Sequence, residues 1–327
     1  MYIHELKNWP ELTWNQAKLA DLLAEVRHLQ GRLLGRMEAL GFDLREQAIL
    51  QTLTQDVIKT SEIEGEKLDA AQVRSSIARR LGMDIGATLQ IDRNIEGIVE
   101  VMLDATRKYA SPLTDERLFA WHSALFPTGR SGMRKIIVGA WRTKESGSMQ
   151  VVSGPIGREW VHYEAPTYDR LKKEMARFMK WFNAASETDP VIKSALAHFW
   201  FVTIHPFDDG NGRIARAIAD MMLSRSEKSA QRFYSMSAQI QRERKEYYDV
   251  LEHCQKGELD ITAWIEWLLN CLRHAIAASE KTLEVVLVKA QFWKSHAGES
   301  FNERQRTIIN RLLDGFEGKL NSSKWAK

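Results

Sequence analysis

Apolar residues at helical spacing recur along most of this chain and constrain its fold more than any other feature. Between Leu19 and Leu33, leucine and valine side chains follow one another at intervals of three and four residues, which gathers them on one face of an α-helix. Only seven prolines occur in 327 residues, so little of the chain is barred from forming helix. The sequence therefore predicts an all-α, mainly helical fold.

Periodicity, caps and glycine stops together indicate where the helices lie. We expect helices over residues 11–42, 44–64, 69–82, 90–110, 115–126, 167–184, 189–204, 212–225, 242–256, 260–278 and 280–295, with another from 302. Thr114 is a suitable N-cap, and Gly41 and Gly82 mark breaks. The last residues, from Asn321, resemble the capped first turn of a helix too short to be stable, so we expect that the chain once continued beyond Lys327.

Residues 128–166 depart from the helical pattern and are rich in glycine. Two short β-leaning runs, 149–153 and 160–163, flank the turn sequence Gly154-Pro155-Ile156-Gly157. Apolar and aromatic runs on either side of such a turn favour an antiparallel hairpin. We expect one small hairpin, which is either a flap beside a functional site or an ordinary exposed hairpin.

Composition argues against several classes of protein. The formal net charge is only +3, so bulk basicity does not indicate nucleic-acid binding. We find no apolar run long enough to predict a membrane span, and no apolar signal segment follows Met1. Cys254 and Cys271 lack the spacing of a metal site or redox motif, which is typical of a reduced cytoplasmic protein.

The most informative motif is the stretch His205-Pro-Phe-Asp-Asp-Gly-Asn-Gly-Arg-Ile-Ala-Arg216. It lies between two predicted helices and so forms a turn that opens a helix. Gly210 and Gly212 allow positive φ and the close approach of a phosphate to backbone N–H groups, while Arg213 and Arg216 share one face of the first helical turn. A corner with solvated arginines explains any one of these residues but not all together. The stretch predicts a site for two or three phosphates.

A second feature is a carboxylate on an apolar helix face. Leu50, Leu53 and Val57 follow one another at spacings of three and four, and the same spacing continues to Thr60 and Glu64. A carboxylate buried on this face needs a cationic partner, because an unpaired buried charge is costly. The alternative is that the side chain lies in water at the frayed helix end, and periodicity alone does not decide between the two.

The stretch from His205 to Arg216 resembles in full the HPFx[D/E]GNGRxxR signature of the Fic family, whose members mostly transfer AMP from ATP to a protein hydroxyl. The resemblance implies a general base at His205, a Mg²⁺ ligand at Asp209, an anion nest at Gly210, Asn211 and Gly212, and phosphate ligands at Arg213 and Arg216. Relatives with lysine in place of Gly212 are kinases, so glycine favours nucleotidyl transfer.

The same resemblance assigns further residues. Thr60…Glu64-Gly65 matches the [S/T]xxxE[G/N] inhibitory motif, which implies that Glu64 pairs with Arg216 and blocks the γ-phosphate subsite. The expected hairpin matches the flap that registers the target segment through main-chain pairing. The remaining positions implied to contact ATP are Val152, Ser153 and Gly154 of the flap and, for the adenine, Tyr247 and Gln255.

Three regions follow from the resemblance: an N-terminal helical domain (1–110) that carries the inhibitory helix, a Fic catalytic core (111–278), and a C-terminal helical segment (279–327) similar to the start of a winged-helix domain. The leading hypothesis is a self-inhibited adenylyltransferase that uses ATP and Mg²⁺ on Tyr, Thr or Ser hydroxyls, its own included. The alternatives are a de-AMPylase using the same site and a nucleotide-sensing transcriptional regulator. DNA binding, the target protein and the oligomeric state, a homodimer included, are left open.

Overall fold

The computed structural model describes residues 1–327 except 40–41, 84–89, 156–157, 159 and 314–327. Its helices are η1 (Ile3–Glu5), α1 (Gln16–Glu38), α2 (Phe42–Ile63), α3 (Ala70–Leu81), α4 (Arg93–Arg107), α5 (Asp115–Leu125), η2 (Lys144–Ser146), η3 (Tyr168–Arg170), α6 (Leu171–Asn183), α7 (Pro190–Ile204), α8 (Asn211–Glu227), α9 (Met236–Arg242), α10 (Arg244–Gln255), α11 (Thr262–Ser295) and α12 (Glu303–Leu313). The prediction of a mainly helical fold is confirmed.

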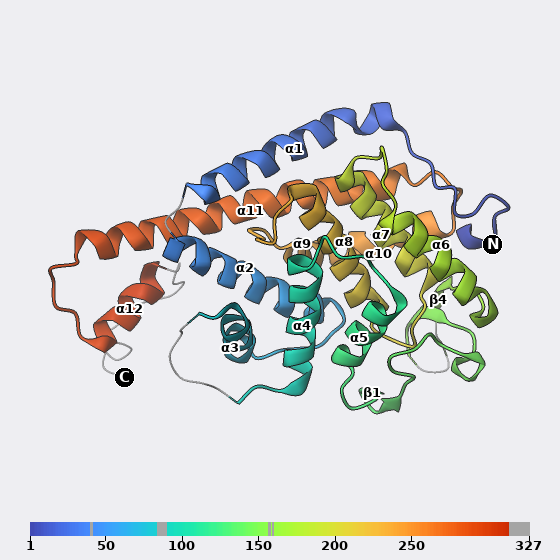
Figure 1. Ribbon diagram of the computed structural model, residues 1–327, viewed down its shortest axis with the longest axis horizontal. Helices are drawn as coiled ribbons and strands as arrows, with labels where there is room; N and C mark the ends of the chain where they lie inside the picture. The colour runs from blue at the N-terminus through green and yellow to red at the C-terminus, as the bar shows by residue number, and fades with distance from the viewer. Residues whose placement is uncertain (40–41, 84–89, 156–157, 159, 314–327) are drawn as a thin grey trace.

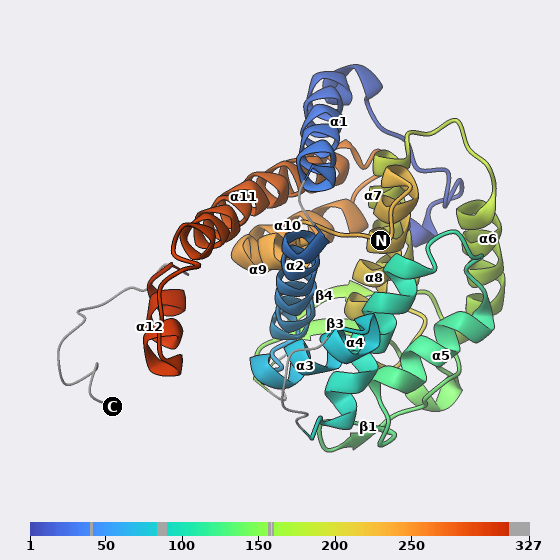
Figure 2. The same cartoon turned by 60° about the vertical axis from the view of Figure 1, so that its left-hand side comes forward.

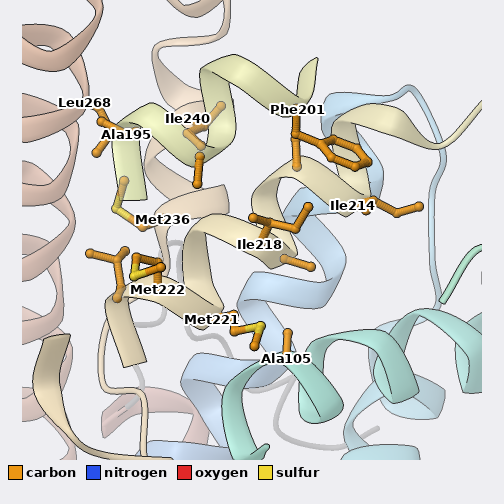
Figure 3. Close-up of a cluster of buried hydrophobic side chains, with 14 of the residues drawn as sticks. Ala105, Ala195, Phe201, Ile214, Ile218, Met221, Met222, Met236, Ile240 and Leu268 are labelled. Atoms are coloured by element: carbon orange, nitrogen blue, oxygen red, sulfur yellow. The ribbon is translucent and has the colours of Figure 1, made fainter. Parts of the chain in front are cut away.

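Helices α7 and α8 form the centre of the molecule, and the other helices pack around them (Figures 1 and 2). Almost all of α7 is buried, and it begins at Pro190 with Asp189 as N-cap, an arrangement that presets the first helical turn. On α8, Ile214, Ile218 and Met221 are fully buried. They face side chains from α4, α7, α9 and α11 in the cluster shown in Figure 3. This packing fixes the turn between α7 and α8 in space.

Helices α1 and α11 run parallel along one side of the molecule (Figure 1). Four ion pairs join them in the described part of the chain: Arg36–Glu280 at 3.5 Å and a regular series of Lys18–Glu266 at 2.6 Å, Glu25–Arg273 at 3.2 Å and Arg32–Glu280 at 2.6 Å. In this series the residues are seven apart on each helix, which is the repeat of two helices that share a common seam. These contacts tie the N-terminal helix α1 to α11.

Several expected helix bounds were wrong. Residues 260–278 and 280–295 form the single helix α11, because the chain between them contains no glycine or proline to end it. The short helix α9 was not expected. The helix expected from residue 11 begins at Gln16, since Thr13 instead pairs its backbone with Leu259 and Ile261. Thr114 caps α5 as expected.

The strands among the described residues form two antiparallel hairpins. The expected one pairs β3 (Gln150–Ser153) with β4 (Trp160–Glu164), with an irregularity between Val151 and Val152. A smaller one, β1 (Arg130–Ser131) with β2 (Arg134–Lys135), was not expected. The expected break at Gly41, the turn residues Ile156 and Gly157, and the chain end from Asn321 lie outside the described residues. No described helix is long and apolar enough to span a membrane.

Candidate active site

The turn between α7 and α8 has an unusual backbone at both ends. His205 closes α7 in the left-handed region, with φ 51° and ψ 58°, and Gly210 precedes α8 with φ 78°. A non-glycine residue in this region stores strain and points to a functional constraint. Gly212 differs from the sequence expectation, because it lies within α8 and needs no positive φ.

His205 is fixed in one tautomer by its own helix. Its Nδ1 lies 3.1 Å from the Val202 carbonyl oxygen, and because a carbonyl only accepts, Nδ1 carries the proton. Nε2 therefore keeps its lone pair, and it has no hydrogen-bond partner among the described residues. Burial, opposed by the bond to Val202, lowers the pKa of His205 to about 4. The ring is thus a neutral acceptor at physiological pH.

Two side chains of the motif itself hold the turn in shape. The Asn211 amide accepts from Phe207 N at 3.0 Å and donates to Phe207 O at 2.8 Å, so it closes the loop and is not free to bind an anion. The Asp208 carboxylate accepts from Ile137 N at 2.9 Å and Ser146 Oγ at 2.5 Å, which fastens the turn to the segment after β2.

Two buried residues outside the motif complete this support, and the sequence did not indicate either. Arg142 donates through Nε to His205 O at 2.9 Å and through Nη2 to Pro166 O. His122 accepts from Gly139 N at 3.1 Å and donates through Nε2 to Asp209 O, also at 3.1 Å. Burial lowers the pKa of His122 to about 4, so it supports the loop as a neutral ring. The sequence contained little indication of either residue, because a single Arg or His far from the motif forms no recognisable spacing pattern with it.

Arg213 and Arg216 are almost fully buried at the start of α8. The Nε of Arg213 and the Nη1 of Arg216 are buried and have no hydrogen-bond partner among the described residues. Buried N–H groups are rarely left unpaired in folded proteins. Together with the free backbone N–H groups of the first helical turn, they form a site suited to an anion with several oxygens.

Glu64 lies directly behind this helix start. Its Oε1 is 2.7 Å from Nη2 of Arg216. The same Nη2 donates to Thr60 O at 3.0 Å, and Nε of Arg216 donates to Thr60 Oγ1 at 2.7 Å. Burial lowers the pKa of Arg216, but Glu64 together with Tyr247 and Tyr248 more than offsets this and holds the pKa above its ordinary value. The two alternatives from periodicity both hold in part: Glu64 has a cationic partner, yet it follows the last residue of α2 and its side chain is 30% exposed.

A second carboxylate, that of Glu66, contacts the start of α8, and the sequence pattern did not indicate it. Glu66 Oε2 lies 2.8 Å from Arg213 Nη1, so the turn after α2 places one carboxylate on each motif arginine. Gly65, at φ 84°, allows this turn because an L side chain rarely adopts that conformation. The helix that ends at Ile63 therefore presents Glu64 and Glu66 together.

Asp209 is the candidate metal ligand. Its carboxylate accepts from Gly210 N at 2.6 Å and from the Ser131 hydroxyl, which leaves lone pairs on both oxygens. No group of three or more potential protein ligands occurs among the described residues. One carboxylate beside a phosphate site nevertheless suits Mg²⁺, which keeps most of its water and phosphate ligands.

The residues expected in the flap, Val152 to Gly154, lie at the end of β3 and directly after it. The expected adenine contacts, Tyr247 and Gln255, lie on α10. His162 of β4 joins the two elements, with Nε2 2.6 Å from Ser153 Oγ and Nδ1 2.6 Å from Glu252 Oε2. Val152 is exposed, and Gly154 follows β3 at φ 101°.

The structure does not leave Tyr247 and Gln255 open to a nucleotide. Tyr247 is 2% exposed and bonds His198 Nε2 at 2.9 Å, and Gln255 is 5% exposed and bonds Thr203 Oγ1 at 3.3 Å. Both side chains serve to pack α10 on α7. The neighbouring Tyr248 is less buried, and its ring lies 5.0 Å from the Arg244 guanidinium.

Comparison with solved structures defines the fold. The chain is similar to a Fic family protein from Desulfovibrio desulfuricans, with a TM-score of 0.61 and 24% identity over 97% of this chain and 84% of that one. It is also similar to Fic-1 from C. elegans, with a TM-score of 0.58 and 20% identity over 82% of this chain and 74% of that one. The arrangement of helices is a Fic fold.

Family comparisons agree with this fold. Residues 112–223 match the Fic/DOC family, and residues 2–83 match a domain of unknown function, DUF4172. The chain therefore carries a region that matches the Fic/DOC family, preceded by a region that matches DUF4172.

Among curated proteins the chain is distantly similar to the protein adenylyltransferases Fic of Culex quinquefasciatus and Drosophila ananassae. Each is 27% identical, over 78% and 71% of this chain respectively. The chain spans less than half of these relatives' length, 45% and 41%.

Proposed function

We propose that this protein is a self-inhibited protein adenylyltransferase, which transfers AMP from ATP to a Tyr, Thr or Ser hydroxyl of a protein target, itself included. The observation that carries the proposal is the meeting of three features at one helix start. These are a neutral histidine with a free Nε2, two buried arginines with unpaired N–H groups, and a carboxylate paired with one of those arginines. The Fic fold and the named activity of the curated relatives support it.

His205 would act as the general base. Its Nδ1–H is held by Val202 O, so Nε2 is the atom that takes the proton from the attacking hydroxyl. Arg142 donates a hydrogen bond to the His205 carbonyl and so would hold the His205 ring in a fixed position relative to the turn. The hydroxyl oxygen then forms a bond to the α-phosphorus, and pyrophosphate leaves with the electrons of the broken P–O bond.

Arg213, Arg216 and the first N–H groups of α8 would bind the phosphates and balance the charge that develops on the leaving pyrophosphate. Asp209 would hold Mg²⁺, which supplies further charge neutralisation at the phosphates when bound. The Asn211 side chain would contribute only indirectly, since both of its groups bond Phe207.

Glu64 would be the brake. While its carboxylate occupies Nη2 of Arg216, that N–H group is not available to a phosphate, and a second anion beside a carboxylate is electrostatically unfavourable. The brake would be moderate rather than absolute, because the Glu64 side chain is partly exposed and can swing into solvent. The reverse reaction remains a second candidate, since Oε2 of Glu64 makes no hydrogen bond among the described residues and could orient a water.

The base assignment is tested in the Glu64→Gly background, where the brake is absent. His205→Ala should abolish transfer, read as the mass of one added AMP in intact-protein spectra, while ATP affinity by calorimetry stays within about threefold. His28→Ala, which removes an exposed histidine of α1, is the matched control and should label normally. Transfer at an undiminished rate in His205→Ala would rule out His205 as the base.

A further inference from the structure

A cavity of about 540 Å³ lies where the extended segment before α1 crosses α6 and α7. Its residues come from four places: the N-terminal segment, the C-terminal half of α6, the connection from α6 to α7, and α7 itself. They are Pro10, Glu11, Leu12, Trp14, Arg177, Lys180, Trp181, Ala184, Thr188, Leu196 and Trp200. The volume falls within the range of sites for small organic ligands, about 300–1,000 Å³. The cavity shares no residue with the turn from His205 to Arg216.

The wall formed by the N-terminal segment is held by hydrogen bonds on both sides of the cavity. Thr13 N donates to Leu259 O at 2.8 Å, and Asn15 N donates to Thr262 Oγ1 at 2.8 Å. At the other end Trp9 Nε1 donates to Glu174 Oε2 at 3.0 Å, and Arg177 Nη2 donates to Trp9 O at 3.1 Å. The cavity is therefore preformed, and a ligand would not have to order it.

The lining combines aromatic faces with cations. Trp14, Trp181 and Trp200 all contribute, and the rings of Trp181 and Trp200 lie 5.1 Å apart at 47°. Arg177 and Lys180 occupy positions three apart on α6, which places them on the same side of that helix. Neither forms an ion pair with any carboxylate in the described part of the chain. Flat apolar surface next to free positive charge matches one kind of ligand, an aromatic ring that bears an anionic group.

We propose that this cavity binds a small aromatic or heteroaromatic monoanion, such as an aromatic carboxylate. The ring lies among the tryptophans, and the carboxylate is bound by Arg177 and Lys180. Glu11 also lines the cavity, so the formal charge of the lining is two cations less one anion, or +1. This balance favours a monoanion over a nucleotide, and it separates this site from the phosphate site at the start of α8.

The probe is indole-3-acetate, titrated into the full chain by calorimetry, with indole-3-acetamide as its neutral counterpart. The expected result is saturable binding of one indole-3-acetate per chain, at least about tenfold tighter than the amide. ATP in excess should not displace it. Absence of saturable binding, equal affinity for the amide, or competition by ATP would each overturn the proposal.

Two variants locate the binding. Lys180→Ala removes a cation of the lining, and Ala184→Trp fills the cavity without changing its charge, since Ala184 is exposed at the end of α6 and also lines it. Both should weaken binding at least about tenfold. Lys172→Ala removes an exposed cation of the same helix outside the cavity and should bind normally. Unchanged binding in Ala184→Trp, with circular dichroism and thermal midpoint as in the wild type, places the probe elsewhere and contradicts the proposal.

Discussion

Gly212 and Glu64 are packed so closely that no side chain fits between them. A Cβ atom on Gly212 would lie 2.3 Å from Glu64 Oε1 and 3.2 Å from Arg216 Nη1. Since Gly212 has ordinary helical φ, the glycine is required by this contact and not by its backbone conformation. Gly212, at the start of the helix that forms the candidate phosphate site, is thus also the residue against which the Glu64 carboxylate packs.

Gly212→Ala should therefore break the ion pair between Glu64 and Arg216. The partly exposed Glu64 can move aside, which leaves the guanidinium of Arg216 buried with fewer partners, at a cost of about 1–3 kcal/mol. In the Glu64→Gly background the same substitution should cost less, because alanine is also the better helix former. Urea unfolding of the four proteins gives the coupling, which we expect to be about 1 kcal/mol. Additive changes in the free energy of unfolding would show that the contact has no energetic weight.

Arg142 is predicted to position His205. Arg142→Lys retains the charge but loses the fork that reaches His205 O and Pro166 O together. We expect the rate of transfer to fall about tenfold or more in the Glu64→Gly background, with ATP affinity unchanged. Arg134→Lys, on the exposed strand β2, is the control. A parallel loss of ATP affinity would instead indicate general disorder of the loop.

The buried histidines predict how stability depends on pH. Burial lowers the pKa of His122 to about 4 and that of His198 to about 3, whereas an unfolded chain has histidines near 6.5. The unfolded state therefore binds more protons in this range, so stability is fully present above about pH 6.5 and is lost as pH falls towards 4. For His122 the loss is at most about 3 kcal/mol.

Urea midpoints measured between pH 4.5 and 7 test this dependence. The free energy of unfolding should rise with pH, and His122→Gln, whose amide can still meet Gly139 N and Asp209 O, should show a shallower slope. An exposed histidine change, His28→Ala, should leave the slope as it is. The same slope in His122→Gln and wild type would mean that His122 is not a buried neutral ring.

The helical fold and the motif turn could be predicted from the sequence because both depend on local patterns. Periodicity identified most of the helices, and the compact motif from His205 to Arg216 indicated the candidate site. The support from His122 and Arg142 could not be found, because these residues meet the turn only through tertiary contacts. Helix α11 was wrongly expected as two helices, although no glycine or proline lies between the two parts to end the first.

Glu64 also shows that local sequence patterns do not determine tertiary contacts. Spacing placed Glu64 on the apolar face of α2, but it could not say whether the carboxylate was buried or solvated. The structure gives it both a partner and partial exposure. Tyr247 illustrates the opposite case, in which an aromatic at a promising position is committed to packing against His198.

We propose that Glu64 restrains an active site that is otherwise complete. Wild type, Glu64→Gly and the control Glu62→Ala, which removes a nearby carboxylate paired with Lys59 at the surface, are incubated with ATP and Mg²⁺ and compared by intact-mass spectrometry. We predict that Glu64→Gly gains the mass of one or more AMP groups at a rate at least about tenfold above wild type and Glu62→Ala. Equal labelling of wild type and Glu64→Gly, or no labelling of either, would contradict the claim.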